Sequence, residues 1–216
     1  MKRYMALPAL VALAVGPLAA QTSVRARLEG RVPPAVVAVV DSIVAAAAAR
    51  DLPTEPVIQK ALEGGAKGVA AERIIVAVQL VGTRLAAAGA AIDRAGVRRT
   101  TAAVEAGAFA LTAGLSGEDV SALVRGAPDD PTQGLRVAAT LAALGVPAVE
   151  TVALVTSTVA AGGDVATLPQ AVQAAMARGA TPSQAARLAQ GGGAGPGKPH
   201  GPPPDRPSRP RPNRPE

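Results

Sequence analysis

Cysteine, tryptophan and histidine are absent or nearly absent from this 216-residue sequence. Because there is no cysteine, the chain forms no disulfide and has no thiol-based metal or catalytic site. His200 is the single histidine, so one chain assembles neither a Ser-His-Asp nor a Cys-His catalytic set, nor a multi-histidine metal site. These absences exclude the commonest nucleophilic and metal-dependent enzymes, and we expect no cofactor.

Aromatic residues are also scarce, since Tyr4 and Phe109 are the only two. Val, Leu, Ile, Met and Phe nevertheless supply 45 of the 170 residues between positions 21 and 190. That share is about 26%, above the range of under ~20% that is typical of disordered chains. We therefore expect a folded body whose core consists of aliphatic side chains and alanine methyl groups, with closely packed helices.

The net charge of +6 is unevenly distributed along the chain. Residues 21–190 contain 15 basic and 14 acidic side chains, whereas residues 191–216 contain five basic and two acidic ones. A nearly neutral body without aromatic stacking residues argues against nucleic acid as a partner.

Residues 1–20 have the composition of a secretory signal peptide. Lys2 and Arg3 precede an apolar run over residues 5–18, and small residues stand just before Gln21. The alternative is an uncleaved membrane anchor, but the run is shorter than the ~20 residues of a spanning helix and two prolines interrupt it. We expect a periplasmic or extracellular chain that begins near Gln21 and has no transmembrane span after cleavage.

Residues 34–190, after a lead-in at 21–33, alternate alanine-rich stretches with glycine and proline, and none has the alternation typical of a strand. The pattern predicts an all-α fold: an array of short antiparallel helical hairpins, arranged as an irregular bundle or a solenoid. The expected helices cover residues 34–50, 54–63, 70–92, 101–113, 117–125, 132–144, 148–160, 168–178 and 182–190.

The helix expected at 70–92 has the clearest amphipathic pattern. Its apolar residues recur every three or four positions and so lie on one stripe of the helix surface. The members of this stripe are Ile74, Val78, Val81, Leu85, Ala88 and Ile92.

Four helix junctions share one pattern, in which a glycine is followed by an apolar residue and then by a helix start. The glycine suits a left-handed helix end, and the apolar residue is expected to pack back on the last turn. At one junction, Ser116 and Asp119 have the spacing of a capping box. The four junctions begin at Gly68, Gly114, Gly145 and Gly179.

Residues 32–74 resemble residues 146–188 at a shift of 114 positions, which suggests a weak internal duplication. Alanine-rich segments match one another easily, so chance similarity is the alternative. The junction spacing lies near that of helical-hairpin repeats, but no tetratricopeptide, ankyrin or HEAT consensus is present.

Residues 191–216 change abruptly to glycine, proline and arginine, which predicts a disordered tail. Its prolines recur every third residue, a spacing that suits grooves for polyproline helices, while its arginines suit anionic surfaces. A second basic cluster is expected around a loop after the helix at 70–92. The candidate partner-binding residues are therefore Arg94, Arg98, Arg99, Arg206, Arg209, Arg211 and Arg214.

Glu118, Asp119, Asp129 and Asp130 form the one local concentration of carboxylates. Paired carboxylates serve acid-base chemistry or calcium binding, but this spacing fits no calcium loop. Helix capping and turn formation account for the same residues, and we expect that role for them.

Taken together, these features predict an exported, non-enzymatic helical scaffold or protein-interaction module. The main alternative is a protein of the envelope membrane surface that binds anionic lipid through amphipathic helices and its cationic tail. A third reading is an enzyme that uses carboxylates alone, with Asp119 and Asp130 as its best candidates.

Overall fold

The structure, a computed structural model, describes residues 24–191, and this part of the chain is entirely helical apart from its turns. A helical turn at residues 24–28 precedes the labelled elements. These elements are α2 (Pro34–Ala48), α3 (Glu55–Ala66), α4 (Ala71–Arg94), α5 (Thr101–Thr112), α6 (Gly117–Gly126), α7 (Pro131–Ala143), α8 (Ala148–Ala160), the 3-10 turn η1 (Val165–Thr167), α9 (Leu168–Ala177) and α10 (Pro182–Gly191).

The all-α fold class is thus confirmed, and each predicted helix has a counterpart in the structure. The predicted ends differ from the observed ones by three residues at most. The largest difference is at the end of α3, which continues to Ala66 instead of 63. The signal peptide at 1–20 and the tail after Gly191 lie outside the described residues and stay predictions.

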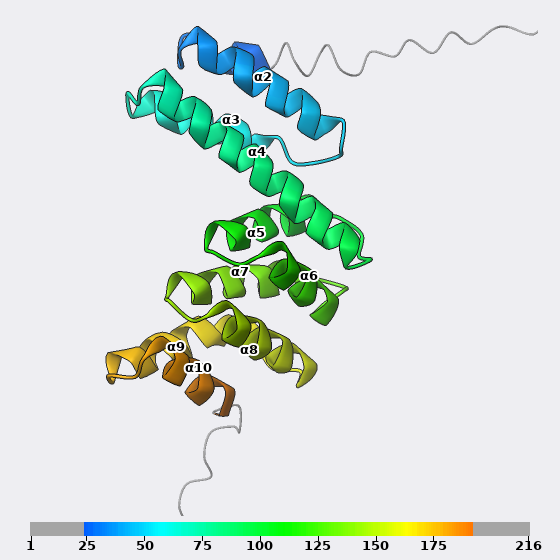
Figure 1. Cartoon of the computed structure of the whole chain (residues 1–216), viewed down its shortest axis with the longest axis vertical. Coiled ribbons are helices and arrows are strands. Elements are labelled where there is room, and N and C mark those ends of the chain that lie inside the picture. The colour runs from blue at the N-terminus through cyan, green and yellow to red at the C-terminus, as the bar shows by residue number, and fades with distance from the viewer. Residues whose placement is uncertain (1–23, 192–216) are drawn as a thin grey trace, which may run out of the picture.

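The helices are arranged in two rows along the long axis of the body (Figure 1). In the even-numbered row, α2 packs on α4, α4 on α6, α6 on α8, and α8 on α10. In the odd-numbered row, α5 packs on α7 and α7 on α9. From α2 to α8, helices that follow each other in the chain also pack together, as do α9 and α10, so the body is an elongated series of helical hairpins.

The glycine junctions have the backbone conformation that their sequence predicts. Gly68, Gly114, Gly145 and Gly179 all have positive φ angles, between 62° and 101°. In each case the next residue donates its backbone N–H to a carbonyl five positions earlier, at 3.0–3.2 Å. This bond satisfies one of the free carbonyls at the helix end, as in a Schellman motif. The junction pattern read from the sequence is confirmed.

The start of α6 is a capping box. The Ser116 hydroxyl accepts a hydrogen bond from the Asp119 backbone N–H at 3.1 Å, and the Asp119 carboxylate accepts one from the Ser116 N–H at 2.8 Å. Both bonds satisfy backbone donors that have no partner within the helix. Asp130 caps α7 in a related way, because its carboxylate accepts from the Thr132 N–H at 3.1 Å.

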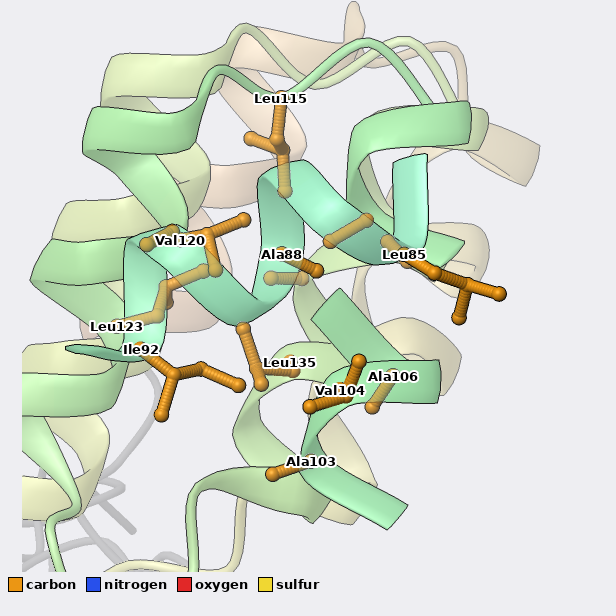
Figure 2. Packing of buried hydrophobic residues seen from close by; sticks show 14 of the residues in the cluster. Leu85, Ala88, Ile92, Ala103, Val104, Ala106, Leu115, Val120, Leu123 and Leu135 are labelled. Carbon is orange, nitrogen blue, oxygen red and sulfur yellow. The ribbon is translucent and has the colours of Figure 1, made fainter. Parts of the chain in front are cut away.

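Small residues bring the helices close together in the core (Figure 2). A Cβ atom added at Gly107 of α5 would lie 3.1 Å from the Cβ of Ala88 on α4 and 3.5 Å from a methyl group of Val120. Larger branched side chains, among them Leu85, Ile92 and Leu135, are fully buried. The core therefore combines close helix crossings with aliphatic packing, as the composition predicts.

Two acidic residues interrupt the apolar helices α2 and α8, and each is paired with an arginine from a neighbouring element. Asp41 lies 3.6 Å from Arg25 of the 24–28 turn, and Glu150 lies 3.5 Å from Arg187 of α10. These ion pairs connect the 24–28 turn to α2 and α10 to α8.

The two segments of the suggested duplication have the same order of elements but not the same spacing. Both α2 and α8 begin directly after a Val-Pro pair, 114 residues apart. The next junctions, at Gly68 and Gly179, are 111 residues apart, so the ungapped alignment is three residues out of register there. The duplication stays a prediction.

Candidate functional site

The odd-numbered row is interrupted between α3 and α5. Within residues 24–191, α5 packs extensively on α7 and α7 on α9, but α3 and α5 share no extensive contact. The cause is the length of α4, which has 24 residues against 12 each for α3 and α5. At 1.5 Å per residue, α4 is long enough to support both shorter helices along its length without bringing them together.

The interruption leaves an open hollow of about 410 Å³, called here the α3–α5 groove. Val81 and Leu85 of α4 and Ala108 of α5 supply apolar lining, and Phe109 of α5 is its aromatic member. Polar and charged side chains complete the lining. The full set is Glu55, Pro56 and Gln59 of α3, Val81, Arg84 and Leu85 of α4, and Glu105, Ala108, Phe109 and Thr112 of α5.

Phe109 is the most unusual residue of the groove. It is the sole aromatic side chain after Tyr4, and 51% of it is exposed. Val76 and Leu80, two more exposed large apolar residues, lie on α4 but do not line the groove. Three of the five such residues in the described body thus belong to α4 and α5, the helices that meet at this groove. A partly exposed aromatic beside an apolar floor is typical of a binding surface.

Glu55 is held at the edge of the groove by a bidentate ion pair. Arg27 donates to both carboxylate oxygens, at 2.7 and 2.8 Å, and Gln59 donates a third hydrogen bond at 2.6 Å. These hydrogen bonds, first that of Arg27, lower the pKa of Glu55 from 4.5 to about 2. Glu55 is therefore charged throughout the neutral range, and its geometry is fixed.

This ion pair predicts a pH-dependent part of the stability. Because folding lowers the pKa of Glu55, its contribution is full above pH 4.5 and is lost as the pH falls towards about 2. The side chain is 52% exposed, so solvent screening limits the contribution to about 0.2–1 kcal/mol. Urea unfolding of the wild type and Glu55→Gln should differ at pH 7 and converge below pH 4.5. A difference that stays constant with pH would contradict this assignment.

Arg84 and Glu105 are the other two charged side chains of the groove. Both are partly buried, and neither forms an ion pair within 4.0 Å in the described part of the chain. Their charges are thus available to a ligand, unlike that of Glu55. The groove combines an apolar floor with one cation and one anion that lack a protein partner.

The three arginines of the predicted basic cluster after α4 have different surroundings. Arg99 forms an ion pair with Asp93 at 3.0 Å and donates to the backbone carbonyl of Arg50 at 2.9 Å, which attaches its loop to the turn after α2. Arg94 lies against the start of α6, where a Cβ at Gly117 would be 3.0 Å from its guanidinium. Arg98 is exposed. The tail arginines Arg206, Arg209, Arg211 and Arg214 lie outside the described residues.

Two members of the predicted carboxylate cluster serve as helix caps. Asp119 and Asp130 cap α6 and α7, as described above. Among residues 24–191, no group of three or more histidine, cysteine, aspartate or glutamate residues is placed to hold a metal ion.

A second hollow, of about 680 Å³, lies between α8, α9 and α10. It is lined by residues of all three helices, among them small residues of α9 such as Ala171 and Ala174, and by polar residues including Asp164 and Arg178. It has no aromatic residue. The α3–α5 groove is the better candidate, because it combines an aromatic side chain with charged ones.

Sequence reasoning did not place Phe109, Glu105 or Arg84 in a site. The available signal was Phe109, the single aromatic residue of an otherwise aliphatic body. Comparisons with protein-family models, curated proteins and solved structures give no match for this chain.

Proposed function

We propose that this protein is an exported, non-enzymatic interaction module whose helical body accepts an apolar segment of a protein partner in the α3–α5 groove. The main support is the lack of extensive contact between α3 and α5, which leaves side chains of α4 open to solvent. The signal-like composition of residues 1–20 supports export.

The chemistry of the groove suits a partner segment with one apolar anchor. Grooves between helices commonly take such segments, and a few buried aromatic or aliphatic contacts supply most of the affinity. Phe109, Val81 and Leu85 provide an apolar surface for the anchor. Arg84 and Glu105 add one charge of each sign, which selects the orientation of the segment.

A role without catalysis agrees with the use of the carboxylates. Asp119 and Asp130, the best candidates for acid-base chemistry, are engaged as helix caps. Substituting either by alanine is therefore expected to affect stability and not the binding of a partner.

Lipid binding by the body is less well supported than binding of a protein segment. The exposed large apolar side chains are spread over α4, α5, α8 and α10. A helix that lies in the membrane surface needs a continuous apolar face. α4 is long and apolar enough to cross a membrane, but it packs on α2, α3, α5 and α6.

Site-specific photo-crosslinking in the native cells tests the proposal. A photoreactive amino acid at Gln59, in the groove, is expected to give discrete adducts with a partner. The matched control is the same probe at Val149, an 80% exposed apolar residue of α8 outside the groove. Loss of an aromatic anchor typically costs about 2 kcal/mol or more, so adding Phe109→Asp should reduce the adducts at least about tenfold.

The folded state of Phe109→Asp is checked by circular dichroism, and because the side chain is half exposed we expect the helical signal to be unchanged. Equal adducts from positions 59 and 149, or adducts that persist in Phe109→Asp, would refute the groove as the interaction site.

A further inference from the structure

We infer that, in the isolated chain, the α3–α5 groove is occupied by the chain's own Arg-Pro segment, residues 204–215. This inference rests on the proposed function, because the same groove is the binding site in both. It adds a form of regulation, since an external partner would have to displace the segment.

The sequence of the segment matches the chemistry of the groove. Pro204, Pro207 and Pro210 are three residues apart, and a polyproline II helix has three residues per turn, so in that conformation these prolines share one face. Arg206 and Arg209 have the same spacing and share another face. Proline-rich ligands of this kind bind in apolar grooves that contain aromatic residues.

The groove offers a partner for each face of the segment. The apolar surface of Val81, Leu85 and Phe109 suits proline rings. Glu105, which has no ion-pair partner in the described body, suits an arginine, and the Phe109 ring suits a guanidinium stacked on its face. Arg84, the cation of the groove, suits the carboxylate of Asp205, which lies between Pro204 and Arg206 in the segment.

The segment is long enough to reach the groove of its own chain. Pro204 follows the last described residue, Gly191, by 13 positions, which span about 40 Å at ~3.1 Å per residue. Gly191 ends α10, which packs on α9, and the groove lies beyond α7 and α5. Four helix spacings of 8–10 Å, from α10 through α9, α7 and α5 to the groove, give a separation of roughly 32–40 Å, which the 13 residues can cover within one chain.

Distance measurement between two spin labels on the full chain tests this inference. The chain has no cysteine, so Thr101→Cys on α5 and Ser208→Cys in the segment give two unique labelling sites. Thr101 is exposed and lies one turn before Glu105 without lining the groove. We expect a narrow, short distance for this pair, and loss of that population when Phe109→Ala or Glu105→Gln is added.

The matched control adds Val149→Ala, on α8 and outside the groove, to the 101–208 pair, and this substitution should leave the short-distance population unchanged. A distance distribution for positions 101 and 208 that is broad and insensitive to Phe109→Ala overturns the inference. A short distance that arises only between chains labelled singly and then mixed also overturns it, because the occupant is then a second copy. Neither result affects the crosslinking test of the proposed function, which needs no Arg-Pro segment.

Discussion

Leu135→Ala is expected to lower the free energy of unfolding by about 2–5 kcal/mol, the range measured for fully buried leucines. Leu135 is completely buried (Figure 2). It lies on α7, the helix that packs against α5, α6, α8 and α9. Removing its isobutyl group leaves a cavity between helices that are held apart by other side chains. Since small domains have only about 5–15 kcal/mol of stability, this loss is a large share of the total.

Leu188→Ala on α10 is the matched control, because it removes the same atoms from a side chain that is 59% exposed. Its effect should stay within about 0.5 kcal/mol. Urea unfolding followed by circular dichroism measures both variants, since the chain contains no tryptophan for fluorescence. Similar midpoints for the two variants would show that α7 is not at the centre of a packed core.

Gly65→Ala is expected to destabilise the protein by about 1–3 kcal/mol, although alanine is the better helix former. A Cβ at Gly65 would lie 2.2 Å from the backbone carbonyl oxygen of Arg31 and 2.8 Å from a methyl group of Val32. Because the main clash is with backbone, α3 and residues 31–32 have to separate. We expect faster trypsin cleavage at Arg25, Arg27 and Arg31 in this variant.

Gly134→Ala is the control, and we expect it to raise the free energy of unfolding instead of lowering it. This helical glycine of α7 has room for a Cβ, whose nearest neighbour would be a methyl group of Val155 at 3.5 Å. Alanine should therefore stabilise α7 by about 0.5–1 kcal/mol. Urea unfolding distinguishes the two substitutions, and a gain of stability in Gly65→Ala would disprove the close approach of α3 to residues 31–32.

The sequence alone predicts which glycines end a helix, but it does not predict which helical glycines have room for a side chain. Gly68 and Gly114 were identified as helix ends from their neighbours along the chain, because a left-handed glycine followed by an apolar residue is a local pattern. The role of Gly65 depends on Arg31, which lies 34 positions away in the chain. No local pattern distinguishes it from Gly134, which tolerates a side chain.

The candidate site, like the role of Gly65, depends on how elements that are distant in the sequence pack together. The sequence predicts one apolar stripe along α4, and five of its six members, Ile74, Val78, Leu85, Ala88 and Ile92, are buried. Val81 belongs to the same stripe but is only partly buried, because it lies where α3 and α5 fail to meet. Periodicity predicts which face of a helix is apolar, but not whether a neighbouring helix covers every turn of it.

The absence of cysteine and the single histidine determined, without any structure, that one chain forms no thiol-based or multi-histidine site, and the scarcity of aromatic residues determined that its core is aliphatic. Glycine and proline placement determined the helices and their caps, since these depend on contacts within a few residues. Only the tertiary structure decided that α4 is too long for its two neighbours to close over it. That outcome depends on how whole helices pack, and it is what opens the groove beside Phe109.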